Sequence, residues 1–195
     1  ADIDSDGDLD IVSASKNPYG TTTYIDWYEN DGAATWTPAF TAADINISAN
    51  VARDLHIADM DRDGDLDIVS ASSGDNTIAW YENDGAANPS WTAADISTTA
   101  DGARNVFVAD IDSDGDLDIV SASHDDDTIA WYENDGNSDP SFTKNVISTS
   151  ADGARGVHIA EIDSDGDLDI VSASRIDNKI AWYENDGAAN PSWST

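Results

Sequence analysis

The residues best suited to chemistry in this chain are aspartates that stand two positions apart. In ADIDSDGDLD, the first stretch of the chain, they are Asp2, Asp4, Asp6, Asp8 and Asp10, with a glycine between the third and the fourth. Calcium takes about six to eight oxygen ligands, and the odd-numbered residues of a tight loop can all point inward to supply them. A glycine at the sixth position permits the sharp bend of such a loop. The spacing therefore predicts a calcium-binding loop rather than an acid–base pair.

The same loop returns three times, as DMDRDGDLD at Asp59, DIDSDGDLD at Asp110 and EIDSDGDLD at Glu161. We expect about four calcium ions, one per repeat, with the seventh position bound through its main-chain carbonyl and the ninth closing the loop. In the fourth loop, a glutamate moves the first carboxylate outward by one methylene, which predicts a weaker site. The candidate ligands are Asp2, Asp4, Asp6, Asp8, Asp10, Asp59, Asp61, Asp63, Asp65, Asp67, Asp110, Asp112, Asp114, Asp116, Asp118, Glu161, Asp163, Asp165, Asp167 and Asp169.

These loops are not EF-hands, which need a bidentate glutamate at position 12 and flanking helices. That position is a serine in every unit, and the flanking sequences have the pattern of strands. Without a cation, neighbouring carboxylates repel by about 4 kcal/mol per pair at about 4 Å, for an effective dielectric near 20. A solvated acidic turn is the alternative, and four recurrences with intact spacing disfavour it.

Four short strands are expected in each unit around these loops. In the second unit they are DLHIAD, LDIVSAS, TIAWYEN and WTAADIS, in which β-branched and aromatic residues alternate with small or polar ones. The turns between them carry Asp-Gly, Asn-Asp-Gly and Asn-Pro. Four strands in a repeat of about 51 residues predict an all-β fold, a β-propeller of four-stranded blades.

The predicted organisation is a single propeller segment over residues 1–195, with repeats at about 1–52, 53–103, 104–154 and 155–195. The innermost strand of a unit occurs only three times, and Ala1 and Asp2 have the pattern of the last residues of a fourth. We therefore expect part of a larger ring, a longer tandem chain or one protomer of an assembly, because an open propeller leaves unpaired strand edges. A free-standing ring of four blades is the less favoured alternative.

The amino-acid composition limits the kinds of partner that we expect for this chain. The 195 residues include 40 acidic and 8 basic ones, for a formal charge of −32, which would repel nucleic acid and anionic membrane surfaces. The chain has no cysteine and no apolar run long enough to cross a membrane. No nucleophile motif accompanies the carboxylates, so we expect no enzymatic activity.

Other recurring residues have two interpretations. The tryptophans of the WYEN motif could stack on sugars, but packing between blades is favoured because propellers need large side chains there: Trp27, Trp80, Trp131 and Trp182. His56 and His158 share a strand position with Phe107, which also favours packing over catalysis. The triplet at residues 46–48 fits the N-glycosylation sequon.

The aspartate loop between two strands, followed by a (W/Y)-x-N-D-G turn, resembles the FG-GAP and VCBS-type repeats, which are related to the calcium-binding blades of integrin α-chain propellers and to some propeller lectins. The resemblance covers nearly the whole chain. It implies a propeller with calcium in the loop that joins the first two strands of each blade, held by the first, third, fifth and ninth positions.

The leading functional hypothesis is a calcium-stabilised extracellular or cell-surface module with a structural or adhesive role. Calcium loops of extracellular modules bind at about 10⁻⁴–10⁻³ M, a range that cytosolic calcium would leave empty. The alternatives are a multivalent lectin, whose repeated weak sites would gain by avidity, and an accessory substrate-binding domain of a larger secreted enzyme. The expected partners are protein or glycan surfaces, copies of the chain itself among them.

Overall fold

A computed structural model describes residues 1–16, 23–32, 40–46 and 49–195. Within these ranges the chain consists of antiparallel strands and contains no helix, which confirms the predicted all-β class. It follows that no described helix is long and apolar enough to span a membrane. The first aspartate loop is farther from the second than the later loops are from one another, so the first repeat is longer, with additions predicted before Trp27 and around Trp36. Most of these additions and the sequon at 46–48 fall outside the described residues or side chains.

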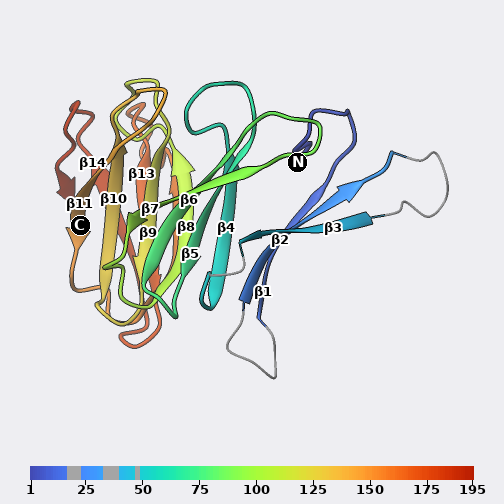
Figure 1. Ribbon diagram of the computed structural model, residues 1–195. Coiled ribbons are helices and arrows are strands. Elements are labelled where there is room, and N and C mark those ends of the chain that lie inside the picture. The colour runs from blue at the N-terminus through green and yellow to red at the C-terminus, as the bar shows by residue number, and fades with distance from the viewer. Residues whose placement is uncertain (17–22, 33–39, 47–48) are drawn as a thin grey trace.

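The strands form one three-stranded and three four-stranded sheets, each with its strands in chain order (Figure 1). The first sheet contains β1 (Ile11–Lys16), β2 (Thr23–Asn30) and β3 (Phe40–Asn46). The second contains β4 (Ala52–Ala58), β5 (Asp67–Ser72), β6 (Thr77–Asn83) and β7 (Trp91–Ser97). The third contains β8 (Ala103–Ala109), β9 (Asp118–Ser123), β10 (Thr128–Asn134) and β11 (Phe142–Ser148). The fourth contains β12 (Ala154–Ala160), β13 (Asp169–Ser174), β14 (Lys179–Asn185) and β15 (Trp193–Ser194).

The same strand pairing repeats from sheet to sheet. Val69 lies opposite Trp80 in the second sheet, and Val120 lies opposite Trp131 in the third. Strands β5 and β9 are buried along their whole length because each has a neighbouring strand on both sides within its sheet and other sheets against its faces. The predicted repeat limits fall just after the first residue of β4, β8 and β12; the limits themselves stay a prediction.

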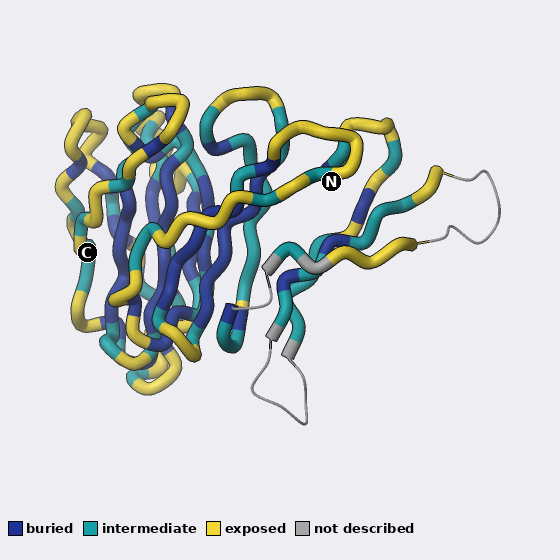
Figure 2. Tube along the Cα trace, in the orientation of Figure 1, coloured by how far each residue is buried: buried dark blue, intermediate teal, exposed yellow. Residues whose placement is uncertain are grey.

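The sheets pack side by side as propeller-like blades. Strand β4 lies beside β8, and β8 lies beside β12, so these three sheets meet through their innermost strands (Figure 1). The first sheet contacts the second through β1 and β4. Figure 2 shows the buried residues running along the middle of this row and the exposed ones in the loops and at its margins. An apolar cluster fills each space between neighbouring sheets.

Two predictions about packing are tested by these clusters. Trp80 and Trp131 lie in clusters between sheets and Trp27 is buried, which confirms the packing interpretation over sugar stacking for these three, whereas Trp182 is exposed. On the innermost strands, the ring of Phe107 lies 5.0 Å from that of His56. It lies 4.8 Å from the ring of His158 on its other side, which confirms packing at that position too.

The first sheet has no innermost strand among the described residues, yet Ala1 occupies the place of that strand's last residue. The amide of Asp10 donates to the carbonyl of Ala1 at 2.6 Å. In the second sheet the corresponding pair is Ala58 and Asp67. This agrees with the expectation that Ala1 has the strand pattern.

Candidate metal centre

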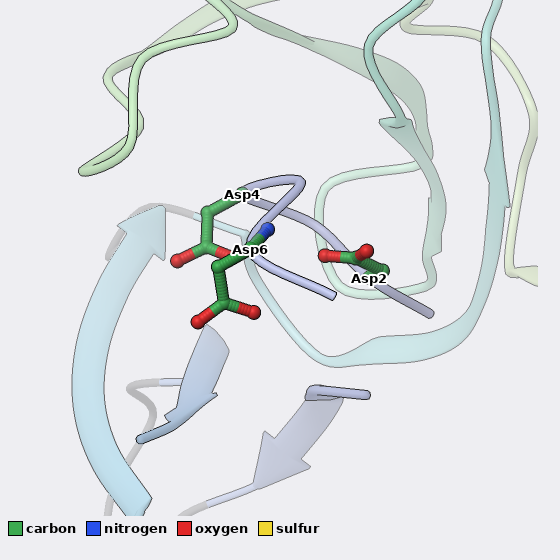
Figure 3. A group of neighbouring side chains, drawn as sticks. All are labelled: Asp2, Asp4 and Asp6. Atoms are coloured by element: carbon green, nitrogen blue, oxygen red, sulfur yellow. The ribbon is translucent and has the colours of Figure 1, made fainter. Parts of the chain in front are cut away.

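The second, third and fourth aspartate loops each lie between the first and second strands of their sheets, as expected, and the first loop precedes β1. In every loop one carboxylate oxygen from each of three residues lies within 4.8 Å of the others. Figure 3 shows the first of these groups, in which the side chain of Asp2 points toward those of Asp4 and Asp6. The groups are Asp2, Asp4 and Asp6; Asp59, Asp61 and Asp67; Asp110, Asp112 and Asp114; and Glu161, Asp163 and Asp165. The structure therefore gathers the first and third positions in all four loops, with either the fifth or the ninth.

The loop backbone explains how side chains two apart come to point inward. In the second loop the amide of Gly64 donates to the carboxylate of Asp59 at 3.1 Å, and that of Asp63 donates to Asp61 at 3.2 Å. Gly64 has a φ of 102° and Arg62 has a φ of 63°, so the chain turns twice through the left-handed region. The glycine was predicted from the sequence, but the left-handed residue at position four was not.

Two carboxylate oxygens at the first position have no hydrogen-bond partner although they are buried. They are Oδ1 of Asp2 and Oδ1 of Asp59. Buried polar atoms are normally paired, because leaving one unpaired costs about 1–3 kcal/mol or more for a charged group. An all-oxygen donor set with such unpaired atoms fits a hard cation such as calcium.

The ninth position has a role in the fold besides its predicted role as a ligand. The side chain of Asp67 is buried, and its two oxygens accept the amides of Met60 at 3.0 Å and Asn83 at 2.9 Å. The same two bonds recur at Asp10, Asp118 and Asp169. This carboxylate therefore ties the aspartate loop to the third strand of its own sheet, and only in the second repeat does it also join the three-carboxylate group.

The seventh position belongs to none of the groups and faces the WYENDG turn instead. A Cβ on Gly85 would collide with the carboxylate of Asp65, and Gly85 has a φ of 66°. The equivalent pairs are Asp8 with Gly32, Asp116 with Gly136, and Asp167 with Gly187. The expected main-chain contact to the metal stays a prediction, but the side chain explains why a glycine ends the turn.

Replacing Gly85 with alanine is therefore expected to destabilise the chain by about 1–3 kcal/mol, from the left-handed backbone and the displaced Asp65. Thermal melting in EDTA measures this without any metal contribution. The double variant with Asp65→Ala should recover the steric part only. A G85A chain that melts like the wild type would contradict the contact.

The repeats with these loops match a known protein family. A family model described as FG-GAP-like repeat matches residues 2–70, 59–121 and 112–172. The chain belongs to the FG-GAP-like repeat family. Each match begins in one aspartate loop and ends in the strand after the next loop, so the family unit spans two neighbouring sheets. A search of curated proteins found no match.

Neighbouring FG-GAP-like repeats are joined at their loops by polar contacts. The side-chain amide of Asn134 donates to the carbonyl of Met60 in the preceding loop at 3.1 Å and to Leu117 in its own at 3.0 Å. Arg62 adds an ion pair to Asp116 at 2.5 Å and donates to the carbonyl of Gly136 at 2.8 Å. The asparagine recurs in each repeat, whereas position four is serine in the other loops, so the arginine contact is particular to one junction.

Several carboxyl groups in the loops of this FG-GAP-like chain have raised pKa values. Burial raises the pKa of Asp67 from 3.8 to about 6, although the amides of Asn83 and Met60 lower it. Burial likewise raises the pKa of Asp118 to about 7. The pKa values of Asp61 and Asp112 are also raised, first by burial and then by neighbouring carboxylates.

Because these pKa values are raised, acid is expected to stabilise the calcium-free chain and to weaken calcium binding. A carboxyl group whose pKa is higher in the folded chain takes up its proton there first. The free energy of unfolding in EDTA should therefore rise as the pH falls from about 8 to about 5. With calcium present, protons compete for the same oxygens, so calcium affinity should fall over that range. Melting curves in EDTA and titration calorimetry check the two trends; a metal-free chain that loses stability on this acidification would contradict the first.

Proposed function

We propose that this chain is a non-enzymatic FG-GAP-like module whose blades are stabilised by calcium and which serves a structural or adhesive role outside the cell. The observation that carries this proposal is the group of three carboxylates in each of the four loops, each group within 4.8 Å. The family match supports the repeat architecture, and the calcium and the role are our inference from the loops.

The first and third positions of each loop would hold the ion, joined by the fifth or the ninth. A bound calcium ion supplies positive charge and further coordination positions for main-chain oxygen and water. The chain's own residues supply the frame: the amides of Gly64 and Asp63 orient Asp59 and Asp61, and Asp67 anchors the loop to β6. The ligands thus lie in a loop whose shape is set largely by its own hydrogen bonds.

The kind of site supports the proposed location outside the cell. Asp6, Asp63 and Asp114 are exposed, and exposed all-oxygen loops of this size are typical of extracellular modules with affinities of about 10⁻⁴–10⁻³ M. Such sites fill at extracellular calcium concentrations. The formal charge of −32 adds a reason for cations to be present in quantity.

A structural or adhesive role is favoured over sugar binding by the position of the tryptophans. Sugar stacking needs a solvent-facing ring, whereas the indoles of Trp80 and Trp131 lie in the cores between sheets and Trp27 is buried as well. A glycan array probed at saturating calcium distinguishes the two roles. An absence of hits is expected, and binding of one glycan class would favour the lectin alternative instead.

The fourth loop provides an internal test of the ligand assignment. The carboxylate of Glu161 accepts the amide of Ser164, whereas the aspartates at this position accept the amide of the loop glycine. We expect the fourth site to bind calcium least tightly, and Glu161→Asp to strengthen it by about tenfold.

Asp59→Glu is the matched control, because it should weaken the second site by a similar factor. Titration calorimetry on the intact chain measures both changes. Unchanged calcium binding in both variants would show that these carboxylates are not ligands.

A further inference from the structure

The spaces between sheets are built from two complementary faces. The face that we call the Trp face includes, in the second sheet, Val69, Ala71, Ile78 and Trp80, with Met60 from its loop. It packs on the Tyr face of the third sheet, formed by Val106, Val108, Ile119, Ala130 and Tyr132. The third sheet's Trp face packs on the fourth sheet's Tyr face through the equivalent residues. Each sheet therefore offers its Trp face to the next sheet in the chain.

The Trp face of the fourth sheet is uncovered. Ile180 is 73% exposed and Trp182 39%, whereas their equivalents in the third sheet, Ile129 and Trp131, are 0% and 1% exposed. Ile162 of the fourth loop is exposed as well, although its equivalent Ile111 is buried. These side chains are of the kind that the chain elsewhere keeps from water.

The Tyr face of the first sheet is uncovered in the same way. Ile11 is 49% exposed, whereas its equivalents Ile68 and Ile119 are 0% exposed. Leu9 and Phe40 are exposed beside it. One chain thus carries an uncovered Trp face and an uncovered Tyr face, the two kinds of face that already pack together between its own sheets. Among the described residues, the Tyr face of the first sheet lacks the innermost-strand part that Val106 and Val108 supply in the third.

The first sheet likewise makes only one of the two polar contacts that the asparagine of the WYEN motif makes in the later sheets. In the later sheets the asparagine of the WYEN motif donates both to its own loop and to the carbonyl of the second loop position in the preceding sheet, as Asn185 does to Ile111 at 3.0 Å. Asn30 donates to Leu9 in its own loop at 3.2 Å. The carbonyl of Ile162 is the equivalent acceptor on the fourth sheet.

We propose that copies of this chain associate head to tail, with the Trp face of the fourth sheet of one copy against the Tyr face of the first sheet of a second copy. The contact is heterologous, because its two faces differ, so it extends to chains or rings of copies rather than stopping at a symmetric dimer. Ile180 and Trp182 of one copy lie against Ile11 and Phe40 of the next, and Asn30 donates to Ile162.

Two variants that each disable one face test this arrangement. Trp182→Asp disables the Trp face, and Ile11→Asp disables the Tyr face; each leaves the other face intact. Val146→Asp is the matched control, because Val146 is 55% exposed on β11 and belongs to neither face. The masses of the intact chains are measured by sedimentation over a range of concentrations, in calcium and at moderate salt to screen the charge.

The wild type and V146D should form dimers and larger species as concentration rises, and each face variant alone should remain monomeric, with a dissociation constant raised at least about tenfold. An equimolar mixture of W182D and I11D should form a dimer and nothing larger, because one intact face of each kind remains. Ile180→Asp replaces W182D if that variant melts below the others. A monomeric wild type, or an I11D chain that still self-associates through its Trp face, would overturn the proposal.

Discussion

Excess EDTA is expected to lower the melting temperature of this chain by at least about 10 °C relative to the calcium-saturated form. A ligand present at about one hundred times its dissociation constant stabilises a folded chain by about 2.7 kcal/mol per site. One kcal/mol shifts the melting temperature by about 2–4 °C in a chain of this size. The free energy of unfolding of a natural protein is of the order of 5–15 kcal/mol. Calcium bound at four sites would therefore supply a major part of the stability of this chain.

The control for this experiment separates calcium binding from charge screening. Because the chain carries a formal charge of −32, added salt alone should stabilise it somewhat. Sodium chloride at matched ionic strength should recover only a small part of the loss, magnesium little more, and calcium all of it. Full recovery in sodium chloride would show that the loops need screening and not a bound ion.

Replacing Trp131 with alanine is expected to cost about 3–5 kcal/mol, whereas the same change at Trp182 should cost less than about 1.5 kcal/mol. The two tryptophans occupy the same position of the same motif, but Trp131 is 1% exposed and Trp182 is 39% exposed. Trp131 packs among Val120, Ala122 and Val157 between two sheets, so its loss leaves a cavity.

Denaturant unfolding in calcium measures the free energy of unfolding of the two variants. The protein concentration is kept low enough for the chain to remain monomeric. The difference between W131A and W182A is more informative than either value, because both remove the same atoms from the same strand position. Equal costs would mean that Trp182 is covered within a single chain, as it would be in a closed ring of four blades, and would contradict the arrangement described above.

Much of this fold was predictable because the same pattern of residues occurs in each repeat. Alternating residues in TIAWYEN predicted β6, β10 and β14, and burial of Trp80 and Trp131 followed from the need for large side chains between blades. The aspartate spacing predicted that carboxylates converge in each loop, since residues two apart in a tight turn lie on one side. The structure brings the first and third positions together in every loop, with the fifth in three loops and the ninth in one.

The remainder depended on contacts between segments that the spacing does not reveal. The ninth-position carboxylate accepts an amide from the third strand, as Asp118 does from Asn134, and the seventh lies against the glycine of a separate turn. The pairing of Arg62 with Asp116 needs two neighbouring blades in place. The recurrence of the loop and the NDG turn in every repeat was the available signal that the two are in contact.

The most direct test of calcium as an integral part of these loops is native mass spectrometry of the intact chain with its metal retained. We predict about four calcium ions per chain, lost together with stability on chelation and reduced by one when the first and third positions of a single loop, Asp110 and Asp112, are changed to asparagine. A folded chain that carries no calcium at millimolar concentrations, and melts the same with and without it, would contradict the account.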